Sequence, residues 1–129
     1  MREPRETINV FVDAFVAAWP TGDASRLADF FTEDAVYCNG PLEPVAGRTA
    51  ILAALQAFME VGGRVSVDMR HVVAEGDLVM TERVDYLEVD GRSLALPVAG
   101  VFELAGPRIK AWRDYFDLAQ FASHLDPGC

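Results

Sequence analysis

The sequence changes character at Gly62-Gly63, and this change constrains the fold more than any other feature. Before it, apolar residues recur at the three- and four-residue spacing of helices. After it, turn-forming triplets at 75–77, 89–91 and 105–107 are spaced as in a meander of long antiparallel strands. Helices followed by strands predict an α+β domain, in which the N-terminal helices pack over the concave face of a curved, mixed or antiparallel sheet. Such a sheet forms a cone-shaped half-barrel whose mouth is a natural apolar pocket.

Local signals place the individual elements. The expected order is a helix over 4–19, a short helix over 24–31 capped by Asp23, a strand over 35–39, a helix over 48–60, the strands of the meander, and a last short helix from 118 to 125. The first helix has proline in its first turn and ends before Pro20 and Gly22. The helix over 48–60 is amphipathic, with Ile51, Leu55 and Met59 on one face together with Phe58.

Length and charge exclude several classes of protein. The 129 residues predict one domain over 1–129, and 20 acidic against 11 basic residues give a net charge of -9 without a basic run. Nucleic acids and anionic membranes attract clustered Lys and Arg, so neither is an expected partner. The N-terminal residues lack the apolar segment of a secretory signal, so none is expected, and no apolar run reaches membrane-spanning length. Cys38 and Cys129 lack metal-binding or CxxC spacing, and only two histidines are present, which predicts a reduced, cytoplasmic setting and no metal.

Three strand segments carry polar side chains two residues apart, and such residues face the same side of a strand. The sets are Tyr37 with Asn39, Arg83 with Asp85, and Trp112 with Asp114 and Phe116. If all three point into the cone, the pocket holds two carboxylates, a guanidinium, a phenol and an amide.

Each set also has an ordinary explanation. An Arg-x-Asp pair on a strand is most often a surface ion pair of little energetic value. Tyr37 and Asn39 precede a Gly-Pro turn, where Asn is common. Asp114 lies between two large aromatic residues, and a carboxylate in such a place is paired or functional. Together these residues indicate a site without specifying a reaction.

Longer motifs around these residues resemble a known family. VMTERVDYL, GVFEL and AWRDYFDL, with VYCNGPLEPVAGR upstream, closely resemble the limonene epoxide hydrolase family over 36–121. That family is similar in fold to nuclear transport factor 2 and ketosteroid isomerase. The resemblance implies a cone-shaped α+β barrel that is typically a homodimer and uses no metal or cofactor.

The resemblance also implies a role for each polar residue. The Asp-Arg-Asp set of the family falls on Asp85, Arg83 and Asp114, and its water-holding Tyr and Asn fall on Tyr37 and Asn39. By this likeness Asp114 takes a proton from water, Asp85 protonates the epoxide oxygen, and Arg83 bridges the two. The implied substrates are water and a small apolar cyclic or terpene epoxide such as limonene oxide or cyclohexene oxide. Water adds directly, so a vicinal diol forms without a covalent intermediate.

Strand alternation and the same resemblance predict the apolar surroundings. The expected substrate contacts are Leu87, Leu96, Val98, Phe116, Phe58 and Trp112, although for such residues a purely structural role is equally ordinary. The opposite sheet face carries Val84, Tyr86 and Tyr115. Exposed on a monomer these would form an apolar patch, which predicts a homodimer through the outer sheet face.

Two other functions stay open on the sequence. The first is an isomerase or cyclase on the same fold, because folds of this kind host unrelated chemistries. Such an enzyme needs an acid and a base but no held water, and Arg83 would have no obvious purpose in it. The second is a non-catalytic domain that binds a small ligand. That function does not account for two carboxylates and an arginine in an apolar pocket.

Overall fold

The computed structural model describes residues 2–120 of the chain. Its elements are the helix α1 (Pro4–Ala18), the 3-10 helices η1 (Trp19–Thr21) and η2 (Ala24–Phe30), the strands β1 (Phe31–Asn39) and β2 (Val45–Ala46), the helix α2 (Arg48–Glu60), and the strands β3 (Arg64–Glu75), β4 (Leu78–Val89), β5 (Arg92–Ala105) and β6 (Arg108–Tyr115). The predicted last helix begins at 118, but most of it and Cys129 lie outside the described residues.

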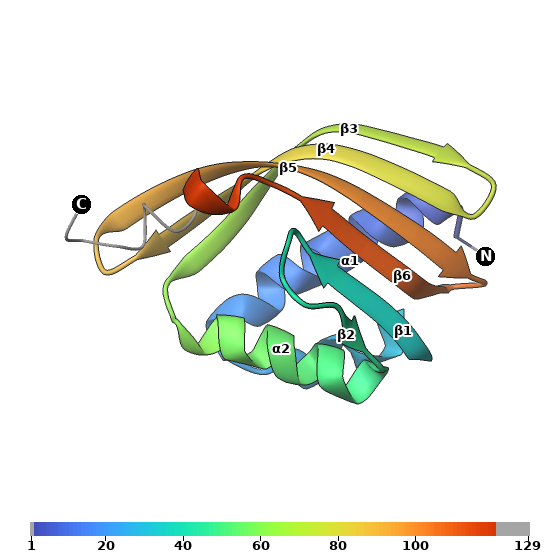
Figure 1. The fold of residues 1–129 in the computed structure, drawn as a ribbon, viewed down its shortest axis with the longest axis horizontal. Helices are drawn as coiled ribbons and strands as arrows, with labels where there is room; N and C mark the ends of the chain where they lie inside the picture. The colour runs from blue at the N-terminus through green and yellow to red at the C-terminus, as the bar shows by residue number, and fades with distance from the viewer. Residues whose placement is uncertain (1, 121–129) are drawn as a thin grey trace.

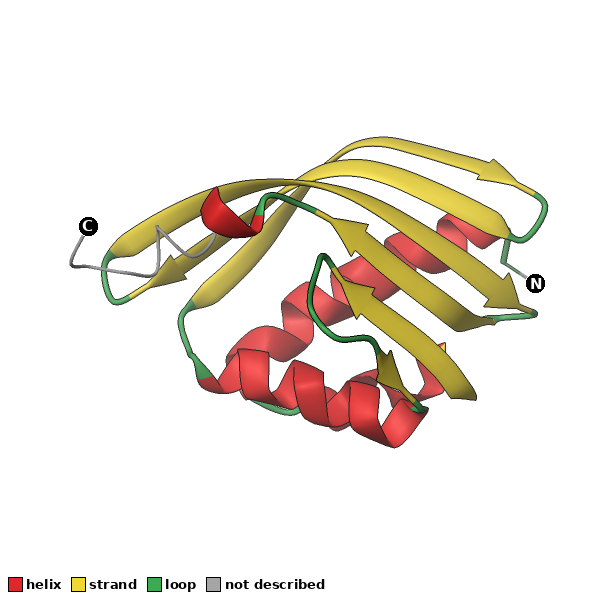
Figure 2. Ribbon diagram, viewed as in Figure 1, coloured by secondary structure: helices red, strands yellow, loops and turns green. Residues whose placement is uncertain are grey.

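The strands form one curved, unclosed sheet in the order β2-β1-β6-β5-β4-β3. Strands β3 to β6 pair antiparallel in chain order, as the spacing of the turn triplets predicts. Strand β1 pairs parallel to β6, which makes the sheet mixed. The sheet arches over α1 and α2, which both lie on its concave side (Figures 1 and 2). The predicted α+β fold with N-terminal helices over a concave sheet is therefore confirmed.

Three local features differ from the sequence expectation. The first strand begins at Phe31 instead of residue 35, because the polar run after Phe31 lies at a register shift against β6 and so hides the strand alternation. The segment 24–30 is a 3-10 helix, although Asp23 caps it as predicted, by accepting a hydrogen bond from the Ser25 N–H. The two-residue strand β2 falls in a predicted loop, since it is too short to show any periodicity.

Aromatic side chains pack α1 against the concave face of the sheet. The Phe11 ring is buried, and its centroid lies 5.3 Å from Phe30, 5.5 Å from Phe31 and 5.2 Å from Trp112, all edge to face. Edge-to-face pairs at this separation add to the gain from burying the rings. The second helix packs beside this cluster through the buried Ile51, Leu55 and Met59. These contacts fix the distance between the helices and the sheet.

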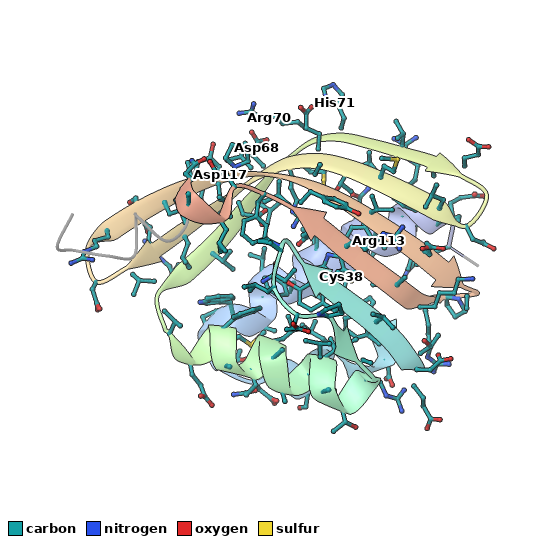
Figure 3. The ribbon with its side chains drawn as sticks, viewed as in Figure 1. Cys38, Asp68, Arg70, His71, Arg113 and Asp117 are labelled. Carbon is teal, nitrogen blue, oxygen red and sulfur yellow. The ribbon has the colours of Figure 1, made fainter. Side chains whose placement is uncertain are left out.

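The outer sheet face is partly apolar and partly charged. Figure 3 shows Asp68, Arg70 and His71 on the outer side of β3, away from the helices. Tyr86 and Tyr115 are 39% and 57% exposed, as their strand positions predict. The expectation that Val84 is exposed is wrong, because it is only 7% exposed; its short side chain lies between register partners on both flanking strands. Within residues 2–120, no helix is long and apolar enough to cross a membrane.

Candidate active site

Strand pairing brings the three polar segments together on the concave face. One row across β4, β5, β6 and β1 consists of Thr81, Gly100, Asp114 and Asn39. The adjacent row in the same strands consists of Val79, Phe102, Trp112 and Tyr37. Further along β4, Arg83 pairs with Val98 and Asp85 with Leu96. Residues that are distant in sequence thus become neighbours because β1 and β6 run parallel and in register.

Arg83 lies between the two aspartates and binds both. Its Nε donates to Asp85 Oδ1 over 2.9 Å, and its Nη2 donates to Asp85 Oδ2 over 3.3 Å. On the other side, Nη1 and Nη2 donate to Asp114 Oδ1 and Oδ2 over 3.2 and 2.8 Å. The side chains of Arg83 and Asp114 are 6% and 7% exposed, whereas Asp85 is 28% exposed. Two bidentate ion pairs on one guanidinium hold the carboxylates in a fixed mutual geometry.

The two carboxylates differ in how many hydrogen bonds they accept. Asp114 Oδ1 accepts from Arg83 and also from Trp112 Nε1, over 2.9 Å. Asp114 Oδ2 and both oxygens of Asp85 each accept only from Arg83 among the described residues. A carboxylate oxygen has two lone pairs, so Asp114 Oδ2 retains acceptor capacity for a further molecule.

Tyr37 and Asn39 present polar groups beside this ion triad. The Tyr37 ring is buried and stacks on Trp112 with centroids 4.1 Å apart. Within residues 2–120, neither the Tyr37 hydroxyl nor the Asn39 amide makes a side-chain hydrogen bond to the protein. Tyr37 is buried and Asn39 half-buried, and polar groups removed from solvent normally have a partner, so both are suited to bind a water or substrate atom.

Burial and charge set the protonation of the triad. Burial raises the pKa of Asp85 above its ordinary value, and the nearby Arg83 charge only partly opposes this. Burial, aided by the negative charge of Asp114, raises the pKa of Tyr37 well above its usual range, so the phenol stays protonated. Burial alone would lower the pKa of Arg83, but Asp114 and Asp85 outweigh it and raise that pKa. The guanidinium is therefore always charged, while Asp85 is the carboxyl suited to carry a proton.

The raised pKa of Asp85 leads to a prediction about stability. The pKa of Asp85 is higher in the folded than in the unfolded chain. The folded protein therefore loses stability as pH rises through the folded-state pKa of this carboxyl. Asparagine cannot ionise, but its amide leaves one Arg83 N–H without an acceptor, so the prediction concerns the pH dependence of the difference in Tm. The Tm of Asp85→Asn relative to wild type should rise as pH rises through the pKa of Asp85. Calorimetry of both proteins over a pH series measures this difference, with the outer-face variant Asp68→Asn as control; a difference that does not rise with pH would contradict the raised pKa of Asp85.

The triad opens onto a cavity of about 210 Å³ between the concave face and the helices. All eleven residues predicted as catalytic or substrate contacts line it: Tyr37, Asn39, Phe58, Arg83, Asp85, Leu87, Leu96, Val98, Trp112, Asp114 and Phe116. The sequence reasoning missed the contribution of α1 through Val12 and Phe15, and that of β3 through Val65 and Val67. The three-residue spacing of Val12 and Phe15 and the two-residue spacing of Val65 and Val67 could have predicted these contacts, because each pair lies on one face of its element.

A mixed sheet bent into an open cone, with helices over its concave face, defines the nuclear transport factor 2-like class of folds. Residues 12–112 match the model of the SnoaL-like domain. The chain belongs to this SnoaL-like domain family.

The chain is also similar in sequence to epoxide hydrolase from Mycobacterium tuberculosis. The chain is 34% identical over 111 residues to Epoxide hydrolase EphG of strain H37Rv, covering 83% of this chain and 71% of the relative. It is also similar to the solved structure of an LEH-like epoxide hydrolase, at 32% identity and a TM-score of 0.72, covering 93% of this chain and 89% of that one. A protein of Catenulispora acidiphila with a ketosteroid isomerase-like fold, at 24% identity and a TM-score of 0.75 over 88% and 90% of the two chains, shows the fold alone. The predicted resemblance to epoxide hydrolases is confirmed.

Proposed function

We propose that this protein is an epoxide hydrolase that adds water to small cyclic or terpene epoxides and forms vicinal diols. The observation that carries the proposal is the double ion pair of Arg83, which places Asp85 and Asp114 at one apolar cavity. Opening an epoxide with water requires removal of a proton from the water and delivery of one to the departing oxygen. An ionised carboxylate can remove the water proton, and a protonated carboxyl group can deliver a proton to the epoxide oxygen.

Asp114 acts as the base. Its Oδ2 has a free acceptor site, and the Tyr37 hydroxyl and Asn39 amide hold the attacking water beside it. As the water oxygen bonds to an epoxide carbon, one water proton passes to Asp114. Because the carboxylate takes a proton and does not itself bond to carbon, no enzyme ester forms.

Asp85 acts as the acid. Its burial favours the protonated form, and it transfers that proton to the epoxide oxygen as the carbon–oxygen bond breaks. The products are a diol, ionised Asp85 and protonated Asp114, so a proton must return to Asp85 before the next turnover. Arg83 keeps a state with one proton on the two carboxyl groups accessible, because its positive charge lies between them.

The apolar lining supports a hydrocarbon substrate. Leu87, Leu96, Val98 and Phe116 form the sheet side of the cavity beyond Asp85, and Phe58 faces them from α2. A pocket of this kind binds by burying apolar surface, while a few polar groups orient the reacting atoms. Limonene oxide and cyclohexene oxide are small apolar epoxides and therefore suitable probes for this cavity.

The test is diol formation from these two epoxides in water enriched in oxygen-18, with a chelator present. We expect chelator-resistant turnover and one labelled oxygen in the diol even within a single turnover. An unlabelled first-turnover diol would indicate an aspartyl ester and overturn the direct attack. If folded protein opens no member of a broader panel of apolar epoxides, the function is instead that of an isomerase, a cyclase or a binding domain.

We also propose that the protein is a homodimer. Tyr86 and Tyr115 on the outer face, together with the 47%-exposed Met80 and the 61%-exposed Val73, leave apolar surface on the monomer. The expected mass by light scattering is twice the 14.1 kDa of the chain. Tyr86→Glu buries a charge in such an interface and should give the monomer mass. A wild-type protein that is monomeric at micromolar concentration would refute this proposal.

A further inference from the structure

Arg83 has one N–H that neither aspartate accepts. A guanidinium carries five N–H donors, and the two carboxylates take four of them. The fifth, on Nη1, points to Thr81 Oγ1 over 3.3 Å. Thr81 is 4% exposed, and its hydroxyl faces the Gly100 carbonyl over 3.5 Å, so its lone pairs remain available to Arg83. With Thr81 in place, all five donors of the buried cation have acceptors.

Gly100 provides the space in which this arrangement fits. It lies between Thr81 and Asp114 in one row of the sheet, and the guanidinium lies over it. A Cβ built on Gly100 would come within 2.5 Å of Arg83 Nη1, 2.8 Å of Thr81 Oγ1 and 2.9 Å of Asp114 Oδ1. A side chain at this position is therefore excluded by the ion triad and not by the backbone, whose strand conformation suits any residue.

We propose that Thr81 and Gly100 are positioning residues that fix the rotation of the Arg83 guanidinium, Thr81 by accepting its fifth N–H and Gly100 by leaving room for it. The consequence for catalysis rests on the proposed epoxide hydrolase function. A guanidinium without the fifth acceptor has a buried, charged donor unsatisfied, and rotating to satisfy it disturbs the bonds to Asp114. Misplacement of a catalytic group by a fraction of an ångström lowers the rate of the chemical step more than it weakens substrate binding.

Thr81→Val and Thr81→Ser separate the hydroxyl from the shape of the side chain. Valine is nearly isosteric with threonine but cannot accept a hydrogen bond, so kcat for epoxide opening should fall about 10- to 100-fold with KM nearly unchanged. Serine keeps the hydroxyl and should restore kcat to within about 3-fold of wild type. Thr32→Val is the control, because the Thr32 hydroxyl bonds to Asp34 on exposed surface. Full activity in Thr81→Val would overturn the proposal.

A second readout does not depend on activity. Nitrogen-15 NMR of the wild type should show separate Nη1 and Nη2 signals for Arg83, because five hydrogen bonds hinder rotation of the guanidinium. Both aspartates still hold four N–H groups in Thr81→Val, so the two signals should stay separate there, but the Nη1 signal should shift because one of its protons has lost its acceptor. Thr81→Ser and Thr32→Val should keep the wild-type Nη1 shift. An unchanged Nη1 shift in Thr81→Val would refute the positioning role. A wild type that opens no epoxide but shows this NMR pattern would refute the proposed function while supporting the role of Thr81.

Gly100→Ala tests the other half of the proposal. Alanine is acceptable to an extended strand, so the variant should fold, but its methyl group displaces Arg83 Nη1. The Nη1 signal should shift and kcat should fall at least as far as in Thr81→Val. A Gly100→Ala protein with the wild-type NMR pattern and kcat would show that the ion triad tolerates the methyl group, which contradicts the inference.

Discussion

Replacing Asp114 by asparagine should lower kcat for epoxide opening about 10³-fold, the loss typical of removing a general base. Asparagine has nearly the same shape but cannot accept a proton from water. It can still accept the Trp112 N–H through its carbonyl oxygen, and the apolar cavity lining is unchanged. Substrate binding, and with it KM, should therefore change little. Steady-state diol formation over a range of epoxide concentrations measures both constants.

The control for this experiment must exclude misfolding. One guanidinium N–H of Arg83 loses its acceptor in Asp114→Asn, so the variant should be compared with the wild type by Tm and by circular dichroism. Asp34→Asn, on exposed surface in β1, is a matched substitution that should leave kcat unchanged. A folded Asp114→Asn protein within about tenfold of wild-type kcat would remove Asp114 from the role of base.

Local signals were sufficient to predict most of the fold. The helix α2 has the predicted bounds because an amphipathic repeat begins after Gly47 and ends before Gly62. The hairpin turns coincide with the predicted triplets because glycine at 76, 91 and 106 adopts the left-handed conformation that these turns require. The parallel pairing of β1 with β6 had no such signal. It joins segments far apart in sequence, and neither segment alone indicates its partner or register.

The sequence predicted the inward-facing site residues of some strands better than those of others. Trp112, Asp114 and Phe116 could be assigned to the inner face, because a carboxylate flanked by aromatics requires a buried partner. Both faces of β4 carry apolar residues, so alternation alone could not decide the side of Arg83 and Asp85. Thr81 gave no signal, since threonine is an ordinary strand residue. Its contact with Arg83 becomes visible only when the register of three strands places Gly100 between Thr81 and Asp114.

Replacing Arg83 by methionine should destabilise the protein by about 3–5 kcal/mol near neutral pH, which corresponds to a fall in Tm of roughly 10–20 °C. The cause is that Asp85 and Asp114 remain in the cavity wall without their shared cation. The sign of the pH dependence follows from the same contacts. Arg83 lowers the pKa of Asp85, so its removal raises that pKa further. The destabilisation should be greatest at alkaline pH and should shrink as pH falls through the raised pKa of Asp85, because protonation removes the charge.

The variant that also carries Asp85→Asn and Asp114→Asn decides whether charge or packing causes this loss. With Met at 83 and both carboxylates neutral, no uncompensated charge remains in the cavity wall, and replacing a whole buried ion cluster by neutral groups is often nearly neutral in stability. The triple variant should therefore recover most of the lost Tm. Its Tm should also lack the decrease with rising pH that ionisation of Asp85 causes. Thermal unfolding of the wild type, Arg83→Met and the triple variant over a pH series measures Tm, and denaturant unfolding measures the free energy of unfolding. If the triple variant is as unstable as Arg83→Met, neutralising the two carboxylates does not restore stability. Arg83 would then stabilise the fold through its packing and not through its charge.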